Sequence, residues 1–159
     1  MVQKEKKILT REEITEKIKH FCAWQERSRL QVSRKLKALG LAPEAEEEMM
    51  LMLSEEGYLN EKRFVEQFVR TRSAAKGWGP AKIAAGLFRE TGSRRDEDLT
   101  ADSVSEKKAL EKLEKDLRKK SAELLRKQDS RIREKLIRFC LSRGFDFETA
   151  SEISARVIQ

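Results

Sequence analysis

The chain has 159 residues, of which 40% are charged, 38% are hydrophobic and 6% are aromatic, and its net charge is +7. This length suits one domain or a few small repeats and excludes a multidomain enzyme. The charged share is far above the roughly 25% of an average globular domain, which favours an elongated helical protein over a single large core. The excess of positive charge indicates a polyanionic partner.

Several kinds of site find no support in the residue inventory. His20 is the only histidine, so neither a histidine-rich metal site nor a nucleophile–histidine pair is expected. Cys22 and Cys140 are far apart and have apolar neighbours, which predicts buried free thiols rather than a disulfide. No signal segment and no run of about 20 apolar residues is present. We therefore expect a cytoplasmic, non-enzymatic protein without membrane contact, metal or cofactor.

The hydrophobic pattern predicts an all-α protein. Apolar residues recur at i, i+4 and i+7 along most of the chain, as at Ile14, Ile18 and Phe21, and period-two strand patterns are nearly absent. Helices are expected over residues 11–24, 29–39, 43–56, 61–75, 80–91, 105–127, 130–143 and 147–157. A short ninth helix within 94–102 remains open.

Residues typical of helix ends lie at the expected boundaries. Capping boxes, in which a hydroxyl accepts the backbone N–H three residues on, are predicted at Thr10, Ser28 and Ser103. N-caps are expected at Asn60 and Asp146, and first-turn prolines at Pro43 and Pro80. Left-handed C-terminal glycines are predicted at Gly40, Gly57, Gly92 and Gly144.

Three of these glycines indicate an internal repeat. Gly40, Gly92 and Gly144 are 52 residues apart both times, and basic segments alternate with acidic ones along the chain. This pattern predicts three tandem three-helix repeats that stack into an elongated, curved helical solenoid of right-handed type. The expected boundaries are a tail at 1–10 and repeats at 11–58, 59–104 (with a polar linker at 93–104) and 105–159. A non-repeating helix bundle is the alternative.

One segment carries a specific resemblance. The stretch 57–83 contains the residues Arg63, Phe64, Phe68, Arg72, Gly79, Pro80 and Ile83 at a characteristic spacing. This pattern resembles the middle module of the RecX regulatory proteins, and weaker similarity extends over about 28–157. The resemblance implies tandem three-helix repeats. It also implies binding to the RecA recombinase filament on single-stranded DNA and modulation, chiefly inhibition, of its ATPase, strand-exchange and co-protease activities in DNA repair and the SOS response.

The candidate binding residues for a partner or DNA are basic and lie in this same segment: Arg63, Arg70, Arg72, Lys76 and Lys82. Between Glu66 and Glu90 no acidic residue offsets the last four of them. Arg63 is either a buried hydrogen-bonding residue or a partner contact, and the other four are either a solvated face or a binding surface. The Gly77–Pro80 stretch is read as a turn and helix start with Trp78 packed over it, because no strand precedes it as a phosphate-binding loop would require.

Two other functions stay open at this point. A basic helical protein of the helix-turn-helix type, acting as a transcription factor on duplex DNA, fits the charge. A helical-repeat scaffold without nucleic acid is the third possibility. No group of side chains has the composition of a catalytic centre. A monomer is expected, with single-stranded or duplex DNA as a possible second partner through the basic face.

Overall fold

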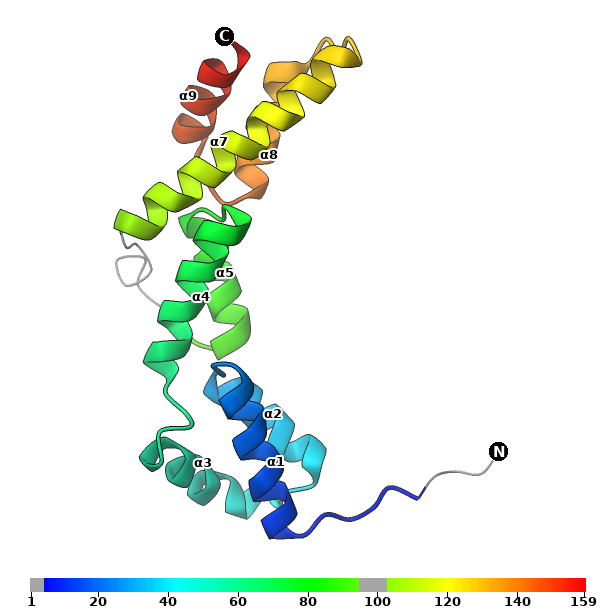
Figure 1. The fold of residues 1–159 in the computed structure, drawn as a ribbon, viewed down its shortest axis with the longest axis vertical. Coiled ribbons are helices and arrows are strands. Elements are labelled where there is room, and N and C mark those ends of the chain that lie inside the picture. Colours follow the sequence, from blue (N-terminus) through cyan, green and yellow to red (C-terminus); the bar gives the residue numbers. More distant parts are fainter. Residues whose placement is uncertain (1–4, 95–102) are drawn as a thin grey trace. The chain divides into compact units, whose positions relative to one another are not determined.

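The computed structural model describes residues 5–94 and 103–159, and this part of the chain is helical without strands. The elements are α1 (Arg11–Trp24), α2 (Arg29–Leu39), the 3₁₀ turn η1 (Pro43–Ala45), α3 (Glu46–Glu55), α4 (Glu61–Lys76), α5 (Pro80–Thr91), α7 (Ser103–Arg126), α8 (Ile132–Ser142) and α9 (Phe147–Ile158). Figure 1 shows them in chain order. The all-α prediction is confirmed. The open helix within 94–102 and most of the polar linker at 93–104 lie outside the described residues.

Helix starts follow the capping residues expected from the sequence. The side chains of Thr10, Ser28 and Asp146 accept the backbone N–H of the residue three positions later. Asn60 does the same for Arg63, at 3.1 Å. These bonds satisfy N–H groups that have no partner inside the helix. The predicted box at Ser103 involves a side chain outside the described set, and α7 begins at Ser103 itself.

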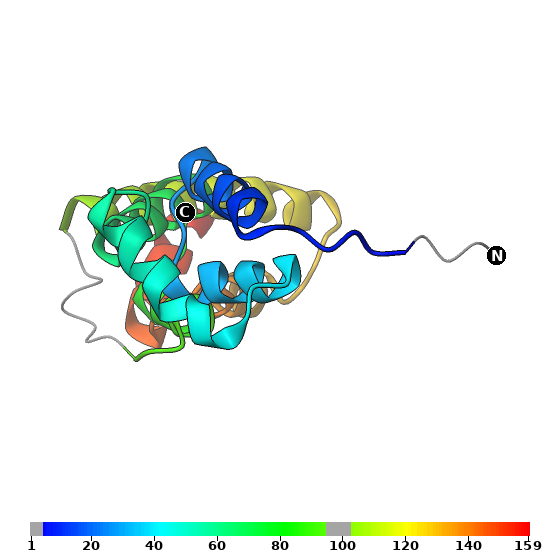
Figure 2. The same cartoon turned by 90° about the horizontal axis from the view of Figure 1, so that it is seen from below.

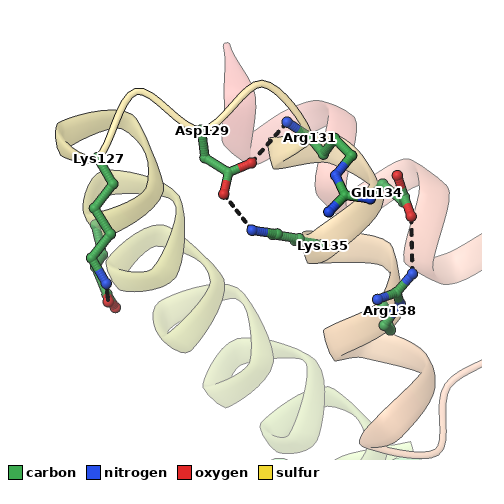
Figure 3. Close-up of polar contacts among 7 residues, drawn as sticks. Lys127, Asp129, Arg131, Glu134, Lys135 and Arg138 are labelled. Carbon is green, nitrogen blue, oxygen red and sulfur yellow. Dashed lines mark hydrogen bonds and ion pairs between the residues drawn. The ribbon is translucent and has the colours of Figure 1, made fainter.

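Two predicted helices begin later than expected. The predicted helix 43–56 is split into η1 and α3, because Ala42 offers no side-chain cap and Ala45 instead donates to the Ala42 carbonyl in a tighter turn. The predicted helix 130–143 begins at Ile132. The Asp129 carboxylate accepts the Arg131 N–H at 2.8 Å and pairs with Lys135, which holds the preceding residues in a turn (Figure 3).

The described residues form two compact units. The first contains the residues up to Phe64 together with Glu90–Gly92, and the second contains the rest. The core of the first unit joins α1, α2 and α3 and includes Ile18, Val32, Leu36, Met49 and Leu53, each at most 2% exposed. Cys22 is buried in this core and is a free thiol, as the sequence predicts.

Ion pairs connect the helices of the first unit. The acidic helix α3 pairs with the basic helices before it through Arg11–Glu48 (3.1 Å), Lys19–Glu56 (2.9 Å) and Arg29–Glu47 (3.8 Å). The acidic residues at α3 are therefore partly neutralised by basic residues of the same unit.

A hydrogen bond ties α2 to the end of α5 within this unit. Ser28, which is fully buried, donates its hydroxyl to the Glu90 carbonyl at 2.5 Å.

The second unit has its main core between α7, α8 and α9. Leu113, Leu117, Leu136, Cys140 and Ala150 are fully buried there, and Cys140 is a free thiol. The leucine stripe of α7 therefore packs against the two helices that follow it.

The end of α4 and the start of α5 are fixed within this second unit by close backbone approach. A Cβ on Gly86 of α5 would lie 2.8 Å from the Phe68 ring of α4, so the glycine lets these helices touch. At the start of α5, the preceding Gly79 donates to the Arg143 carbonyl at 2.7 Å and Ala81 donates to the Gly144 carbonyl at 3.2 Å. The α4–α5 turn is thus docked on the residues that follow α8.

Candidate functional site

Trp78 lies in the turn between α4 and α5, where the sequence places most of the candidate cations. Its backbone N–H donates to the Arg72 carbonyl at 3.1 Å, and Gly77 before it has a φ of +64°, which glycine adopts without strain. Its ring meets Phe68 edge-on, with centroids 6.2 Å apart and an interplanar angle of 70°. The turn therefore holds the indole in one orientation, and the expected packing of Trp78 over this joint is confirmed.

Three of the predicted cations surround this indole. The Nζ of Lys82 lies 4.8 Å from the ring centroid, the guanidinium carbon of Arg72 lies 5.3 Å from it, and the Nζ of Lys76 lies 5.7 Å from it. All three distances are within the range at which a cation is attracted to the π face of tryptophan. We call Arg72, Lys76, Trp78 and Lys82 the Trp78 cluster.

The members of the Trp78 cluster differ in exposure. Lys76 is exposed, whereas Arg72 and Lys82 are half-buried. The guanidinium carbon of Arg72 also lies 4.9 Å from the centroid of the Phe68 ring. The Arg72 Nε is buried without a hydrogen-bond partner in the described part of the chain. Arg72 therefore contributes to packing as well as to charge.

The other two candidate residues stand apart from this cluster. Arg70 is exposed, and no ion pair or ring contact of it occurs within residues 5–94 and 103–159. Arg63 donates its Nε to Glu26 at 2.9 Å and its Nη2 to the Gly57 carbonyl at 2.7 Å, so its contacts lie in the first unit. This geometry corresponds to the hydrogen-bonding alternative for Arg63, although the side chain is 43% exposed rather than buried.

Sequence reasoning did not find the residues that support the cluster from α7 and from the end of α8. Arg143 donates one nitrogen to the Lys76 carbonyl and the other to Asp116 at 3.1 Å, and Asp116 also accepts from Lys112 at 3.0 Å. Arg143 and Asp116 are separated by 27 residues, and no local spacing signals such a contact.

The Asp116 carboxylate is stabilised in its ionised form. Desolvation is the largest single influence on its pKa and raises it, but the hydrogen bonds from Lys112 and Arg143 together outweigh desolvation, so the pKa of Asp116 lies below its ordinary value of 3.8. The Asp116 side chain is only 16% exposed. It therefore stays ionised and neutralises Lys112 and Arg143, leaving the charges of Lys76 and Lys82 uncompensated by it.

The electrostatic character of the site is positive. No acidic residue occurs between Glu66 and Glu90, and the carboxylate of Asp116, which bonds to Arg143 beside the turn, already has two cationic partners. A surface with fixed cations around an aromatic ring suits phosphate or carboxylate groups of a macromolecular partner.

The described residues contain neither a metal-binding cluster nor a membrane-spanning helix. No group of three or more histidine, cysteine, aspartate or glutamate side chains within them is placed to hold a metal ion. None of the described helices is long and apolar enough to span a bilayer.

Comparison with known proteins gives a consistent result. The family model described as "RecX, second three-helix domain" matches residues 60–89, which include the Trp78 cluster. The Regulatory protein RecX of Pseudomonas entomophila (strain L48) is 38% identical over 126 residues, covering 79% of each chain. The Regulatory protein RecX of Pseudomonas fluorescens (strain SBW25) is 38% identical over 133 residues, covering 82% of this chain and 83% of the relative.

The same family appears among solved structures. The crystal structure of RecX from Lactobacillus salivarius superposes with a TM-score of 0.73 over 92% of this chain and 95% of that one, at 20% identity. At this identity the likeness concerns the fold. Together with the match to a three-helix domain, it confirms the prediction of tandem three-helix modules.

Proposed function

The chain belongs to the RecX family of regulatory proteins, and on this premise we propose that it binds the RecA recombinase and inhibits it. The target is the RecA filament on single-stranded DNA, and the inhibited activities are ATP hydrolysis, strand exchange and co-protease function during DNA repair and the SOS response. Proteins of this family are regulators rather than enzymes, so the proposed effect comes from binding alone. Family membership favours this function over the transcription-factor alternative.

The observation that carries the proposal is the position of the Trp78 cluster. It lies inside the segment that matches the family model, at residues 60–89, and it presents cations that no described carboxylate neutralises. Acidic patches of a protein filament and the phosphates of its DNA are complementary to such a surface. We therefore propose Arg70, Lys76 and Lys82 as direct contacts. Arg72 acts as a contact that is also needed for packing, and Arg63 orients the start of α4.

Repeated modules provide a reason for effective inhibition. We propose that the boundaries 11–58, 59–104 and 105–159 delimit three modules, each of which contacts a different part of the filament. Weak contacts of linked modules add, because each later contact forms at a high effective concentration. A monomer is then sufficient, and light scattering should report a mass near 18.5 kDa for the free protein.

The decisive experiment measures ATP hydrolysis by RecA on single-stranded DNA. The protein should lower the rate at concentrations well below that of RecA, because a molecule bound to a filament affects many subunits. An unchanged rate at several-fold molar excess over RecA would overturn the proposal. A control with RecA in the absence of DNA separates an effect on the filament from an effect on free RecA.

A further inference from the structure

The first unit contains a basic groove that the proposed function does not use. A cavity of 620 Å³ is lined by residues of α1, α2 and the segment between them, and its charged and aromatic lining includes Lys17, Phe21, Trp24, Arg27 and Lys35. A cavity of this volume is in the size range of ligand sites. Figure 2 shows α1 and residues 5–10, which lead into it, in dark blue.

A second cavity extends this groove along α1. It measures 490 Å³, shares Lys17 and Leu39 with the first, and adds Lys6, Lys7 and Lys37 to the lining. Glu16 is the one carboxylate among the residues that line the two cavities. Since α1 has 14 residues, the groove follows a helix about 21 Å long. We call these two joined cavities the α1–α2 groove.

The acidic residues at α3 do not neutralise this groove. They pair with Arg11, Lys19 and Arg29, which line neither cavity. Within the groove, Lys7 has a long ion pair with Glu13 at 3.5 Å, and both partners are exposed, so this pair contributes little. The groove therefore keeps a line of positive charge with a single acidic residue.

Two aromatic side chains, Phe21 and Trp24, lie among the cations that line the groove. The Arg27 guanidinium lies 3.7 Å from the centroid of Phe21, and its Nε donates to the Phe21 carbonyl at 3.0 Å, so this cation is fixed over a ring. Trp24, the last residue of α1, is 77% exposed. No ring or cation contact occupies its indole within the described residues. Because Trp24 lines the 620 Å³ cavity, its exposed indole offers an apolar ring within the charged groove.

We propose that the α1–α2 groove binds single-stranded nucleic acid, with phosphates along Lys17 and Lys37 and an unpaired base stacked on Trp24. Grooves that combine tracking cations with an open aromatic ring are the common solution for binding single strands, because every base offers a π face. In a duplex the bases are already stacked and cannot reach the indole. An acidic peptide would satisfy the cations but leave Trp24 unused, so single-stranded nucleic acid fits more of the site.

This inference extends the proposed function, since the proposed target is a filament on single-stranded DNA, but it concerns a different unit and a different ligand. Its test contains no recombinase. A protein that fails to bind an oligonucleotide would overturn the groove assignment and leave the recombinase proposal standing. A protein that binds the oligonucleotide but does not inhibit RecA would overturn the recombinase proposal and leave the groove assignment standing.

The first experiment uses the intrinsic fluorescence of Trp24. The chain has two tryptophans, so Trp78→Phe leaves Trp24 as the only indole. A thymidine oligonucleotide of about 20 residues, longer than the site of most single-strand-binding folds, should quench the emission in a saturable way. Deoxyuridine and uridine oligonucleotides of the same length, which differ only in the 2′-hydroxyl, identify the preferred sugar, and binding of either supports the proposal. Equal affinity for a duplex, or displacement by poly-glutamate at the same charge concentration, would overturn it.

The second experiment uses variants and fluorescence anisotropy of a labelled oligonucleotide. Trp24→Ala should weaken binding about tenfold, which corresponds to about 1.4 kcal/mol, and Trp24→Phe should retain most of the affinity because a ring remains. Lys17→Glu with Lys37→Glu should weaken binding and reduce its dependence on salt, since these side chains would contact phosphates. The matched control is Arg34→Glu with Lys62→Glu, two exposed cations that line neither cavity.

All substituted side chains in this set are exposed, so circular dichroism melting curves should match the parent protein. Equal losses from the two charge-reversal pairs would show a diffuse attraction to the whole protein and overturn the groove. Unchanged affinity of Trp24→Ala in a folded protein would overturn the stacking contact and with it the assignment to single strands.

Discussion

Gly144 lies directly against the backbone of Lys82, and a Cβ added to Gly144 would meet the Lys82 nitrogen at 2.4 Å. Gly144 also has a φ of +89° and accepts a hydrogen bond from Ala81. This contact joins the residues that follow α8 to the first turn of α5, which carries part of the Trp78 cluster. The glycine is thus required twice, by its left-handed backbone and by the close approach.

Substitution of this glycine separates the two requirements. Gly144→Ala should lower the free energy of unfolding by about 3 kcal/mol, from left-handed strain together with overpacking. Gly40→Ala is the matched control, because Gly40 has a φ of +88° but no atom within 4 Å of an added Cβ. It should cost about 1 kcal/mol from strain alone. Urea unfolding followed by circular dichroism measures both, and equal costs would contradict the close contact.

The carboxylate that supports the Trp78 cluster should make stability depend on acid pH. Because folding lowers the pKa of Asp116, its stabilising contribution is fully present above the ordinary pKa of 3.8 and is lost as the pH falls through the lower folded value. At neutral pH, Asp116→Asn should reduce the free energy of unfolding by about 2 kcal/mol, since two charge-assisted hydrogen bonds are lost.

The difference between Asp116→Asn and the parent should shrink as the pH is lowered below the ordinary pKa of aspartate. Glu134→Gln is the control, because Glu134 pairs with Arg138 on the surface and should change stability by no more than about 0.5 kcal/mol. If the difference in free energy of unfolding between Asp116→Asn and the parent did not change with pH, the charge of Asp116 would not be what stabilises the site.

The two thiols should be inert in the folded protein. Cys22 is 5% exposed and Cys140 is fully buried, and burial raises the pKa of Cys22 to about 11. The thiolate is the reactive form, so its fraction at Cys22 is about 100-fold below that of an ordinary thiol. Iodoacetamide at mildly alkaline pH should therefore modify neither cysteine until urea is added, as mass spectrometry would show. Rapid modification without denaturant would contradict the burial of these side chains.

Local features of the sequence predicted the fold well, and contacts between distant residues account for what was missed. Helix starts at Thr10 and Ser28 depend on bonds that span three residues, so the sequence pattern is sufficient to find them. The cations around Trp78 are also close in sequence. In contrast, Arg143 reaches the Lys76 carbonyl across 67 residues and Arg63 reaches Glu26 across 37.

No local sequence pattern indicates that Arg72 is half-buried. Spacing places Arg72 with Arg70 and Lys76 near the end of α4, but only packing against Phe68 and Trp78 distinguishes its role. The α1–α2 groove was not anticipated either, because its lining comes from an N-terminal segment and two helices that carry no recognisable motif.

The turn between α4 and α5 should be the surface through which the protein reaches the filament. Arg70→Glu with Lys76→Glu changes two exposed cations without disturbing Arg72 or Lys82, which are half-buried. Helicity and melting temperature should stay close to those of the parent, because exposed substitutions usually change stability by at most about 0.5 kcal/mol. Inhibition of RecA should nevertheless weaken at least about tenfold, which requires only about 1.4 kcal/mol of lost binding.

The control pair is Lys115→Glu with Lys119→Glu on α7, which carries the same change of charge on exposed positions. The basic residues of α7 are interleaved with acids, and its Lys112 and Arg118 form ion pairs within the helix, so we expect this pair to matter less. The measurement is the protein concentration that halves ATP hydrolysis by RecA on single-stranded DNA. If both pairs weaken inhibition equally, the attraction depends on net charge and the Trp78 cluster is not the contact surface. If only the first pair does so, the turn between α4 and α5 is the surface that binds the filament.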